Sequence, residues 1–160
     1  MDKNTQRALV PMYHVIEKSD EELYRELGLL KLAIAEDAEG SDKFGMEVEY
    51  TAEAFGPFDG LVAVGRAYFK RVSRRAYSIV CGDDPEDTPE REKIRGAFQG
   101  QKEIVAATLA AALVSTLGTA PALATIIGAL VVKICLGPAA DMAYENMCRV
   151  WKDNLPEVPQ

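Results

Sequence analysis

The sequence predicts a mostly all-α fold: a single helical domain over residues 1–160, built as a bundle of about six helices. Apolar residues recur every three or four positions in several segments, as they do on the buried side of a helix. Glycines and prolines separate these segments, as expected where helices end and begin. In addition, residues 104–136 carry one charge, Lys133, and form an apolar run that only the turn-like residues 118–121 interrupt. We therefore expect a central apolar helical hairpin over residues 101–136, with any strand short and N-terminal.

The first 40 residues contain one ambiguous segment and one clear helix. Residues 1–18 are predicted to be irregular or to form a short strand or helix, because Pro11 breaks the apolar stretch 8–16 and its periodicity fits either structure. The sequence Ser19-Asp20-Glu21-Glu22 is typical of a capping box, so a helix should begin there and end before Gly40. Its predicted buried face consists of Leu23, Leu27, Leu30 and Ile34.

A long helix is predicted in the middle of the chain. Asp59 is suited to cap its start, and the helix should run to Cys81 and stop at Gly82. Its predicted buried face consists of Leu61, Val64, Tyr68, Val72, Ala76 and Ile79. The acidic residues 83–87 then form a connector, and Thr88-Pro89-Glu90 supplies a cap, a first-turn proline and a first-turn acid for another helix.

Three further segments complete the chain. Residues 44–55 alternate apolar and acidic side chains as a strand does, yet Phe44, Val48 and Phe55 also fit one helical face, so both structures remain open. Gly137-Pro138 is expected to end the hairpin and to open a last helix. The apolar residues of that last helix are Met142, Met147, Val150 and Trp151. Residues 154–160 are predicted to be an irregular tail.

The hairpin has two interpretations. Its arms, 104–117 and 122–132, would be about 21 Å and about 16 Å long, short of the roughly 30 Å of a bilayer core. Small side chains on both arms would let the two helices pack closely. We expect a buried hairpin whose Lys133 reaches outward to solvent. The alternative is a hairpin that inserts into a membrane after activation or oligomerisation, with these candidate residues: Leu109, Leu113, Ile126, Ile127, Leu130 and Lys133.

Charge is distributed unevenly along the chain. The net charge of −7 disfavours a nucleic-acid partner, because affinity for phosphates comes mainly from basic side chains. Residues 1–60 hold 14 acidic and 6 basic groups, whereas residues 61–82 hold five basic groups and no acid. The candidate partner-docking face consists of Arg66, Lys70, Arg71, Arg74 and Arg75. These cations either pair with the acidic N-terminal part or stay solvated, or they dock an acidic protein, an anionic lipid surface or a phosphate-bearing ligand.

No pattern in the sequence predicts a catalytic residue, a metal ligand or a cofactor. His14 is the single histidine and has no nucleophile beside it, and Glu47, Glu49 and Glu53 support a metal site only weakly. The glycine-rich residues 56–60 lack the spacing and the lysine of a phosphate-binding loop.

The three cysteines form no CxxC pair, and the polar residues 1–7 lead into no signal-peptide core. Cys81, Cys135 and Cys148 are therefore predicted to be reduced, buried thiols in a cytoplasmic protein. We expect a non-enzymatic interaction module, an adaptor or regulatory subunit such as those of bacterial multi-protein systems, whose partner is another protein or a second copy. The alternative is a membrane-active, toxin-like effector that uses the hairpin.

Overall fold

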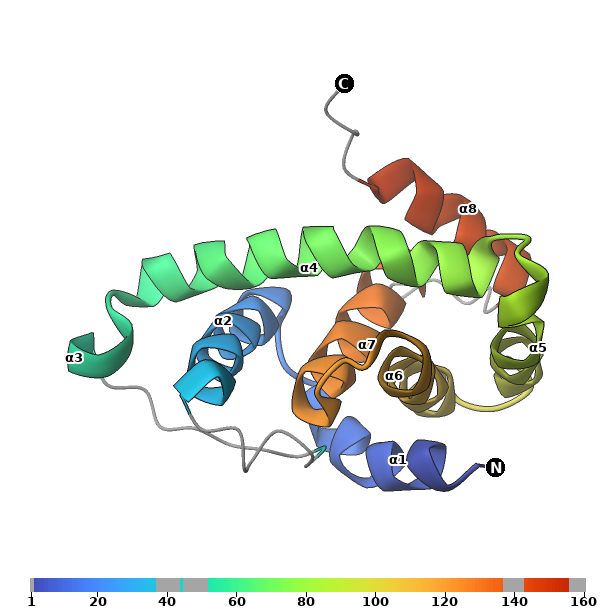
Figure 1. The fold of residues 1–160 in the computed structure, drawn as a ribbon, viewed down its shortest axis with the longest axis horizontal. Helices are drawn as coiled ribbons and strands as arrows, with labels where there is room; N and C mark the ends of the chain where they lie inside the picture. The colour runs from blue at the N-terminus through green and yellow to red at the C-terminus, as the bar shows by residue number, and fades with distance from the viewer. Residues whose placement is uncertain (1, 37–43, 45–51, 137–142, 156–160) are drawn as a thin grey trace.

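The computed structural model describes residues 2–36, 44, 52–136 and 143–155. Over these residues the chain forms helices joined by turns and contains no strand, which confirms the predicted all-α class. The elements are α1 (Lys3–Val15), α2 (Asp20–Glu36), α3 (Ala52–Phe55), α4 (Phe58–Cys81), the 3-10 helix η2 (Pro85–Asp87), α5 (Thr88–Ala97), α6 (Lys102–Leu117), α7 (Pro121–Leu136) and α8 (Tyr144–Asn154) (Figure 1).

The α6–α7 hairpin lies at the centre of the molecule. Helix α4 runs along one side, with α2, α7 and α5 packed beneath it, and α1 lies on the opposite side (Figure 1). Helix α1 packs on α6 and α7, α5 packs on α6, and α8 packs on α7 and on the end of α4. The hairpin is therefore covered from several directions by helices that are more polar than itself.

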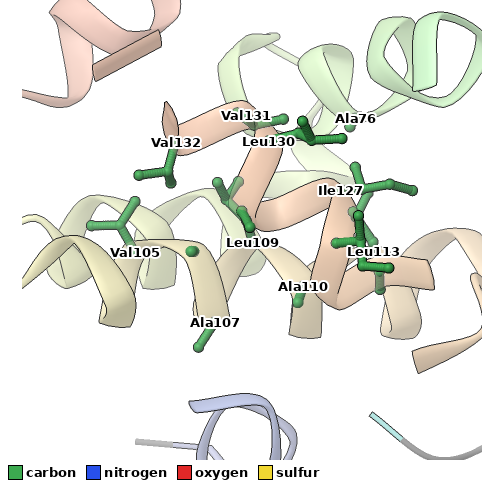
Figure 2. Close-up of a cluster of buried hydrophobic side chains, with 14 of the residues drawn as sticks. Ala76, Val105, Ala107, Leu109, Ala110, Leu113, Ile127, Leu130, Val131 and Val132 are labelled. Carbon is green, nitrogen blue, oxygen red and sulfur yellow. The ribbon is translucent and has the colours of Figure 1, made fainter. Parts of the chain in front are cut away.

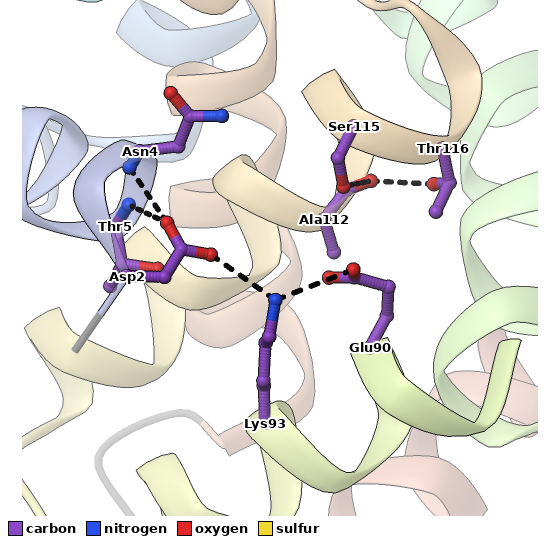
Figure 3. A network of polar contacts seen from close by, with 8 residues as sticks. All are labelled: Asp2, Asn4, Thr5, Glu90, Lys93, Ala112, Ser115 and Thr116. Carbon is purple, nitrogen blue, oxygen red and sulfur yellow. Dashed lines mark hydrogen bonds and ion pairs between the residues drawn. The ribbon is translucent and has the colours of Figure 1, made fainter.

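The ambiguous N-terminal segment is a helix. The Asp2 carboxylate accepts hydrogen bonds from the backbone N–H of Asn4 (2.7 Å) and of Thr5 (3.2 Å), which satisfies two of the free donors at the start of α1 (Figure 3). Helix α1 continues through Pro11 and buries Ala8 and Met12 against the hairpin. Side-chain capping and burial thus decide for the helix over a strand.

The predicted cap of α2 is confirmed, whereas those of α4 and α5 are not. Ser19 Oγ accepts a hydrogen bond from the Glu22 N–H at 3.2 Å, as a capping box requires. Helix α4 starts after Pro57 instead of Asp59, and α5 starts after Asp87 instead of Thr88, neither with a side-chain cap. In both helices the residue expected to cap already lies in the first turn, because the helical backbone begins one or two residues earlier.

The buried faces of α2 and α4 are close to those predicted. Leu23, Leu27 and Leu30 of α2 are buried, and Ile34 is partly buried. On α4 the buried predicted residues are Leu61, Val72, Ala76 and Ile79, whereas Val64 and Tyr68 are half-buried. Those two residues lie at the flank of the α2–α4 contact and not at its centre.

The centre of the α2–α4 contact is a pair of glycines that the sequence interpretation missed. A Cβ atom on Gly65 would lie 1.8 Å from the backbone oxygen of Tyr24, and one on Gly28 would lie 2.1 Å from that of Leu61. Only residues without a Cβ let two backbones approach so closely. The contact fixes α4 against α2 along the first half of α4.

The predicted hairpin is confirmed. Residues 105–113 of α6 and 122–132 of α7 are all buried, and Gly118 ends α6 in the left-handed conformation at φ 65°. A Cβ atom on Gly128 would lie 2.5 Å from the backbone oxygen of Ala106, so small residues do bring the arms together. The proposed membrane-facing residues Leu109, Leu113, Ile126, Ile127 and Leu130 are all core residues; Figure 2 shows most of them between the helices.

The prediction of three reduced cysteines is wrong for two of them. Cys81, in the last turn of α4, and Cys148, in α8, form a disulfide with their Cα atoms 5.7 Å apart and 67 residues apart in sequence. Cys135 is the free, buried cysteine of α7. The sequence could not show this pairing, since nothing local indicates that α8 returns to the end of α4.

Pro138 and Met142, assigned above to the last helix, lie outside the residues that the structure describes.

Candidate functional site

The predicted docking face lies on the outward side of α4. Arg66, Lys70, Arg71 and Arg75 are exposed, and Arg74 is half-buried. These five residues, called the basic face below, occupy the side of α4 away from the residues that pack inward. Helix α4 therefore presents cations to solvent along nearly three of its turns.

The position of this face is fixed by what lies behind it. The glycine contact holds α4 on α2, and Tyr24 of α2 meets Phe69 of α4 edge to face with ring centres 5.7 Å apart. Further along α4, Trp151 of α8 donates a hydrogen bond to Ser73 Oγ at 2.8 Å. The basic face is thus carried by a helix that α2 and α8 both hold in place.

Tyrosine rings orient part of the basic face. The guanidinium carbon of Arg66 lies 4.9 Å from the ring centre of Tyr24, and that of Arg71 lies 5.4 Å from the ring centre of Tyr68. Lys31 of α2 places its ammonium 4.9 Å from the same Tyr68 ring. Such cation–π contacts leave the N–H groups free to bind an anion. Lys31 therefore extends the basic face, and the sequence interpretation missed it because inter-helix neighbours have no local signal.

Burial and nearby positive charges shift the pKa values of Lys31, Tyr24 and Tyr68. Burial and the nearby Arg71 cation both lower the pKa of Lys31. Burial raises the pKa of Tyr24 and of Tyr68, whereas the neighbouring arginines act in the opposite direction. The tyrosines therefore stay neutral and keep their rings available to the cations, while the cations repel one another.

Several of the described carboxylates form ion pairs with cations outside the basic face. Glu26 pairs with Lys18 at 2.6 Å, and Asp2 pairs with Lys93 at 3.4 Å, where Lys93 also meets Glu90 (Figure 3). Within the described ranges, no carboxylate forms an ion pair with the exposed cations of the basic face. For Arg66, Lys70, Arg71 and Arg75 the expected pairing with the acidic N-terminal part is therefore absent from residues 2–36, and the acids of residues 37–43 and 45–51 lie outside the described chain.

Lys133 makes contacts that the sequence interpretation did not include. Its side chain is partly exposed, and its ammonium donates to the backbone oxygens of Ile16 (3.4 Å) and Lys18 and lies 3.8 Å from the Asp20 carboxylate. Carbonyls at the end of a helix lack intrahelical partners and favour a cation. Lys133 thus joins α7 to the connection between α1 and α2.

The residues considered for catalysis or metal binding do not form a common site in the described part of the chain. His14 is exposed on α1, Glu53 is exposed on α3, and Glu47 and Glu49 lie outside the described residues. The described part of the chain contains no group of three or more His, Cys, Asp or Glu side chains placed to hold a metal ion. Burial raises the pKa of the Cys135 thiol to about 12, so this cysteine stays protonated.

Among the described helices, none combines the length and the apolar character that crossing a membrane requires.

Comparison of the chain with models of known protein families, with curated proteins and with solved structures found no match.

Proposed function

We propose that this protein is a non-enzymatic interaction module, an adaptor or regulatory subunit, that binds an acidic segment of another protein on its basic face. One observation carries the proposal: Arg66, Lys70, Arg71 and Arg75 are exposed together on one anchored helix, and no described carboxylate pairs with them. Like charges held together repel one another, and a bound anionic partner relieves that repulsion.

The stacked arginines favour carboxylates as the partner groups. A guanidinium lying against a tyrosine ring has already lost part of its freedom, so it costs less to immobilise on binding. Its planar N–H groups match a carboxylate with two parallel hydrogen bonds. The remainder of the chain is acidic, with a net charge of −7 overall, which repels extended polyanions but leaves one local positive field for a small acidic segment.

The test is a binding titration with a defined acidic probe. Fluorescein-labelled poly-glutamate peptide is added to the wild type and to Lys70→Glu/Arg71→Glu, and its anisotropy is followed at two salt concentrations. The matched control is Lys3→Glu/Lys102→Glu, which reverses two other exposed lysines, on α1 and α6. We expect affinity to fall by at least about tenfold in the first variant, and with salt, but not in the control. No binding by the wild type, or equal losses in both variants, overturns the proposal.

A second candidate is the membrane-active effector, favoured by the burial of α6 and α7 over most of their length. Each arm has 16 residues, or about 24 Å of helix, so insertion would need several copies or a thinned bilayer. Dye release from anionic liposomes, with the reduced and the oxidised protein, tests this candidate. Release that Leu113→Lys abolishes supports it, and the absence of release from both forms contradicts it.

A cytoplasmic location, also expected from the sequence, remains a prediction, and the expectation of three reduced cysteines no longer supports it. The Cys81–Cys148 disulfide counts against it, because disulfides are rare in reducing compartments. Trapping of free thiols in intact cells decides: alkylation of all but Cys135 supports the cytoplasm, and protection of Cys81 and Cys148 contradicts it.

A further inference from the structure

Helix α8 lies against α4 and α7 and buries three side chains there. Tyr144, Met147 and Trp151 are 9%, 0% and 2% exposed, and their spacing of three and four places them on one side of α8. The site that receives them, bounded by α4 and α7, is called the α8 site below. It already holds an amphipathic helix of 11 residues, so its fit to such a helix needs no further assumption.

Two directional bonds at the α8 site make it selective. Trp151 Nε1 donates to Ser73 Oγ at 2.8 Å, and the Tyr144 hydroxyl donates to the backbone oxygen of Val80. The Trp151 ring also meets Tyr77 edge to face, with ring centres 5.7 Å apart. Ser73 and Val80 are themselves buried, so they lose their partners if α8 leaves and no similar helix takes its place.

The disulfide lies between these two anchors. Cys148 follows Tyr144 by four residues and precedes Trp151 by three, and its partner Cys81 ends α4. Both cysteines are half-buried instead of enclosed, so a small thiol reagent can reach the bond. While the bond exists, α8 of the same chain is tied to the site.

Once the bond is reduced, nothing in the site distinguishes one α8 from another. An isolated helix of 11 residues is marginal in water, so α8 needs a site on which to dock. The α8 of a second copy offers the same indole, hydroxyl and thiol in the same geometry, and exchange of identical elements is a low-cost route to a dimer. We propose that the α8 site is an exchangeable docking surface for α8 of a second copy of this chain, and that the Cys81–Cys148 disulfide controls the exchange.

The redox steps balance with glutathione as the reagent. Reduction consumes two glutathione thiols, breaks the Cys81–Cys148 bond, and yields two cysteine thiols and one glutathione disulfide. Reoxidation after exchange consumes glutathione disulfide: the Cys148 thiolate of one copy attacks it, which forms a mixed disulfide and releases one glutathione thiolate. The Cys81 thiolate of the second copy then attacks the Cys148 sulfur and releases the second glutathione thiolate. The product is a dimer linked by a Cys81–Cys148 bond between copies.

Two complementary variants test the proposal, both carrying Cys135→Ala so that no third thiol takes part. Cys81→Ser keeps the thiol of α8, and Cys148→Ser keeps the thiol of the site. The two proteins are mixed with glutathione disulfide and compared with each alone on a non-reducing gel, after circular dichroism has shown that both are folded. We expect about tenfold more covalent dimer in the mixture than in either protein alone, with peptide mapping that finds Cys81 joined to Cys148.

Removal of one anchor supplies the matched control. Adding Trp151→Ala to the Cys81→Ser variant removes the indole without touching either thiol, and the dimer yield should fall. A yield in the mixture no higher than in the separate proteins overturns the proposal, as does a yield that Trp151→Ala leaves unchanged. Wild-type protein that is reduced, concentrated and reoxidised should give a dimer by light scattering, and a strictly monomeric product contradicts it. The basic face is unaltered in every variant, so poly-glutamate binding tests the proposed function separately.

Discussion

The α6–α7 pair and the α2–α4 pair are both built on close glycine contacts, but they differ in what surrounds the contact. Gly128 of α7 approaches the backbone of α6 among buried aliphatic side chains. Gly65 of α4 approaches the backbone of α2 beside half-buried tyrosines and exposed cations. The same packing device therefore builds the core in one pair and presents a charged surface in the other.

This difference separates stability from recognition in the molecule. Residues 105–113 and 122–132 of the hairpin offer no polar group to a partner, because their side chains are buried beneath α1, α2, α5 and α8. The α2–α4 pair offers cations whose positions are set by the packing beneath them. Changes at the glycine contacts should therefore alter folding, whereas changes at the cations should alter binding.

The largest expected effect is at the glycine of α4. Gly65→Ala places a Cβ atom 1.8 Å from the Tyr24 backbone oxygen, so α2 and α4 must separate. We expect about 3 kcal/mol of destabilisation, even though alanine favours helices over glycine by about 1 kcal/mol. Gly128→Ala, with its nearest contact at 2.5 Å, should cost less. Urea unfolding followed by circular dichroism measures both.

Gly96→Ala is the control for these two substitutions. Gly96 lies within α5, and a Cβ atom there would meet nothing within 4 Å. Helix propensity alone then acts, and the variant should be stabilised by about 0.5–1 kcal/mol. Equal destabilisation at Gly65 and Gly96 would show that α2 and α4 do not touch through their backbones.

The next effect is at the lysine that connects the hairpin to the N-terminal helices. Lys133→Met keeps the length of the side chain but removes the donor to the Ile16 and Lys18 carbonyls, and should cost about 2 kcal/mol. Asp20→Asn removes only the partly exposed ion pair and should cost less than about 0.5 kcal/mol. Thermal unfolding of both variants distinguishes them, and a neutral Lys133→Met would refute this role.

A smaller change in stability is expected on the basic face. Lys70→Glu/Arg71→Glu alters two exposed side chains without a described ion-pair partner, so the free energy of unfolding should change by less than about 1 kcal/mol. Urea unfolding measures this change. A loss of several kcal/mol would mean that these cations stabilise the fold, and their exposure would then have no bearing on binding.

The smallest effect is a titration shift. Arg71→Gln removes a cation that lowers the pKa of Lys31, so the pKa should move up toward 10.5, which carbon-detected NMR titration of the lysine can follow. In the wild type the folded state holds this proton less tightly than the unfolded chain does. Stability should therefore rise with pH between the lowered pKa and 10.5, and the rise should shrink in the variant.

Sequence patterns were sufficient to predict the elements that depend on neighbouring residues in the chain. The apolar run and the turn at Gly118 predicted the hairpin, because a helix that is apolar on every side must be buried. The capping serine and the leucine spacing predicted α2, and the charge pattern of residues 61–82 located the basic face on α4. Each of these signals lies within a few residues of the structure that it predicts.

The features that were missed or wrong join distant parts of the chain. Lys133 bonds Ile16 across 117 residues, and Cys148 bonds Cys81 across 67. Lys31 shares the Tyr68 ring with Arg71 only because Gly28 and Gly65 let α2 and α4 meet. No periodicity records which helices become neighbours, so these contacts could not be derived before the packing was known.

The most direct test of the docking surface is a map of where an acidic ligand binds. Isotope-labelled protein is titrated with poly-glutamate peptide while amide NMR shifts are recorded. We expect shifts confined to residues 63–78 of α4 and to the neighbourhood of Lys31 on α2, with residues 105–132 of the hairpin unchanged. Shifts elsewhere on the molecule, or none at all, would contradict the claim that the α2–α4 pair carries the recognition surface.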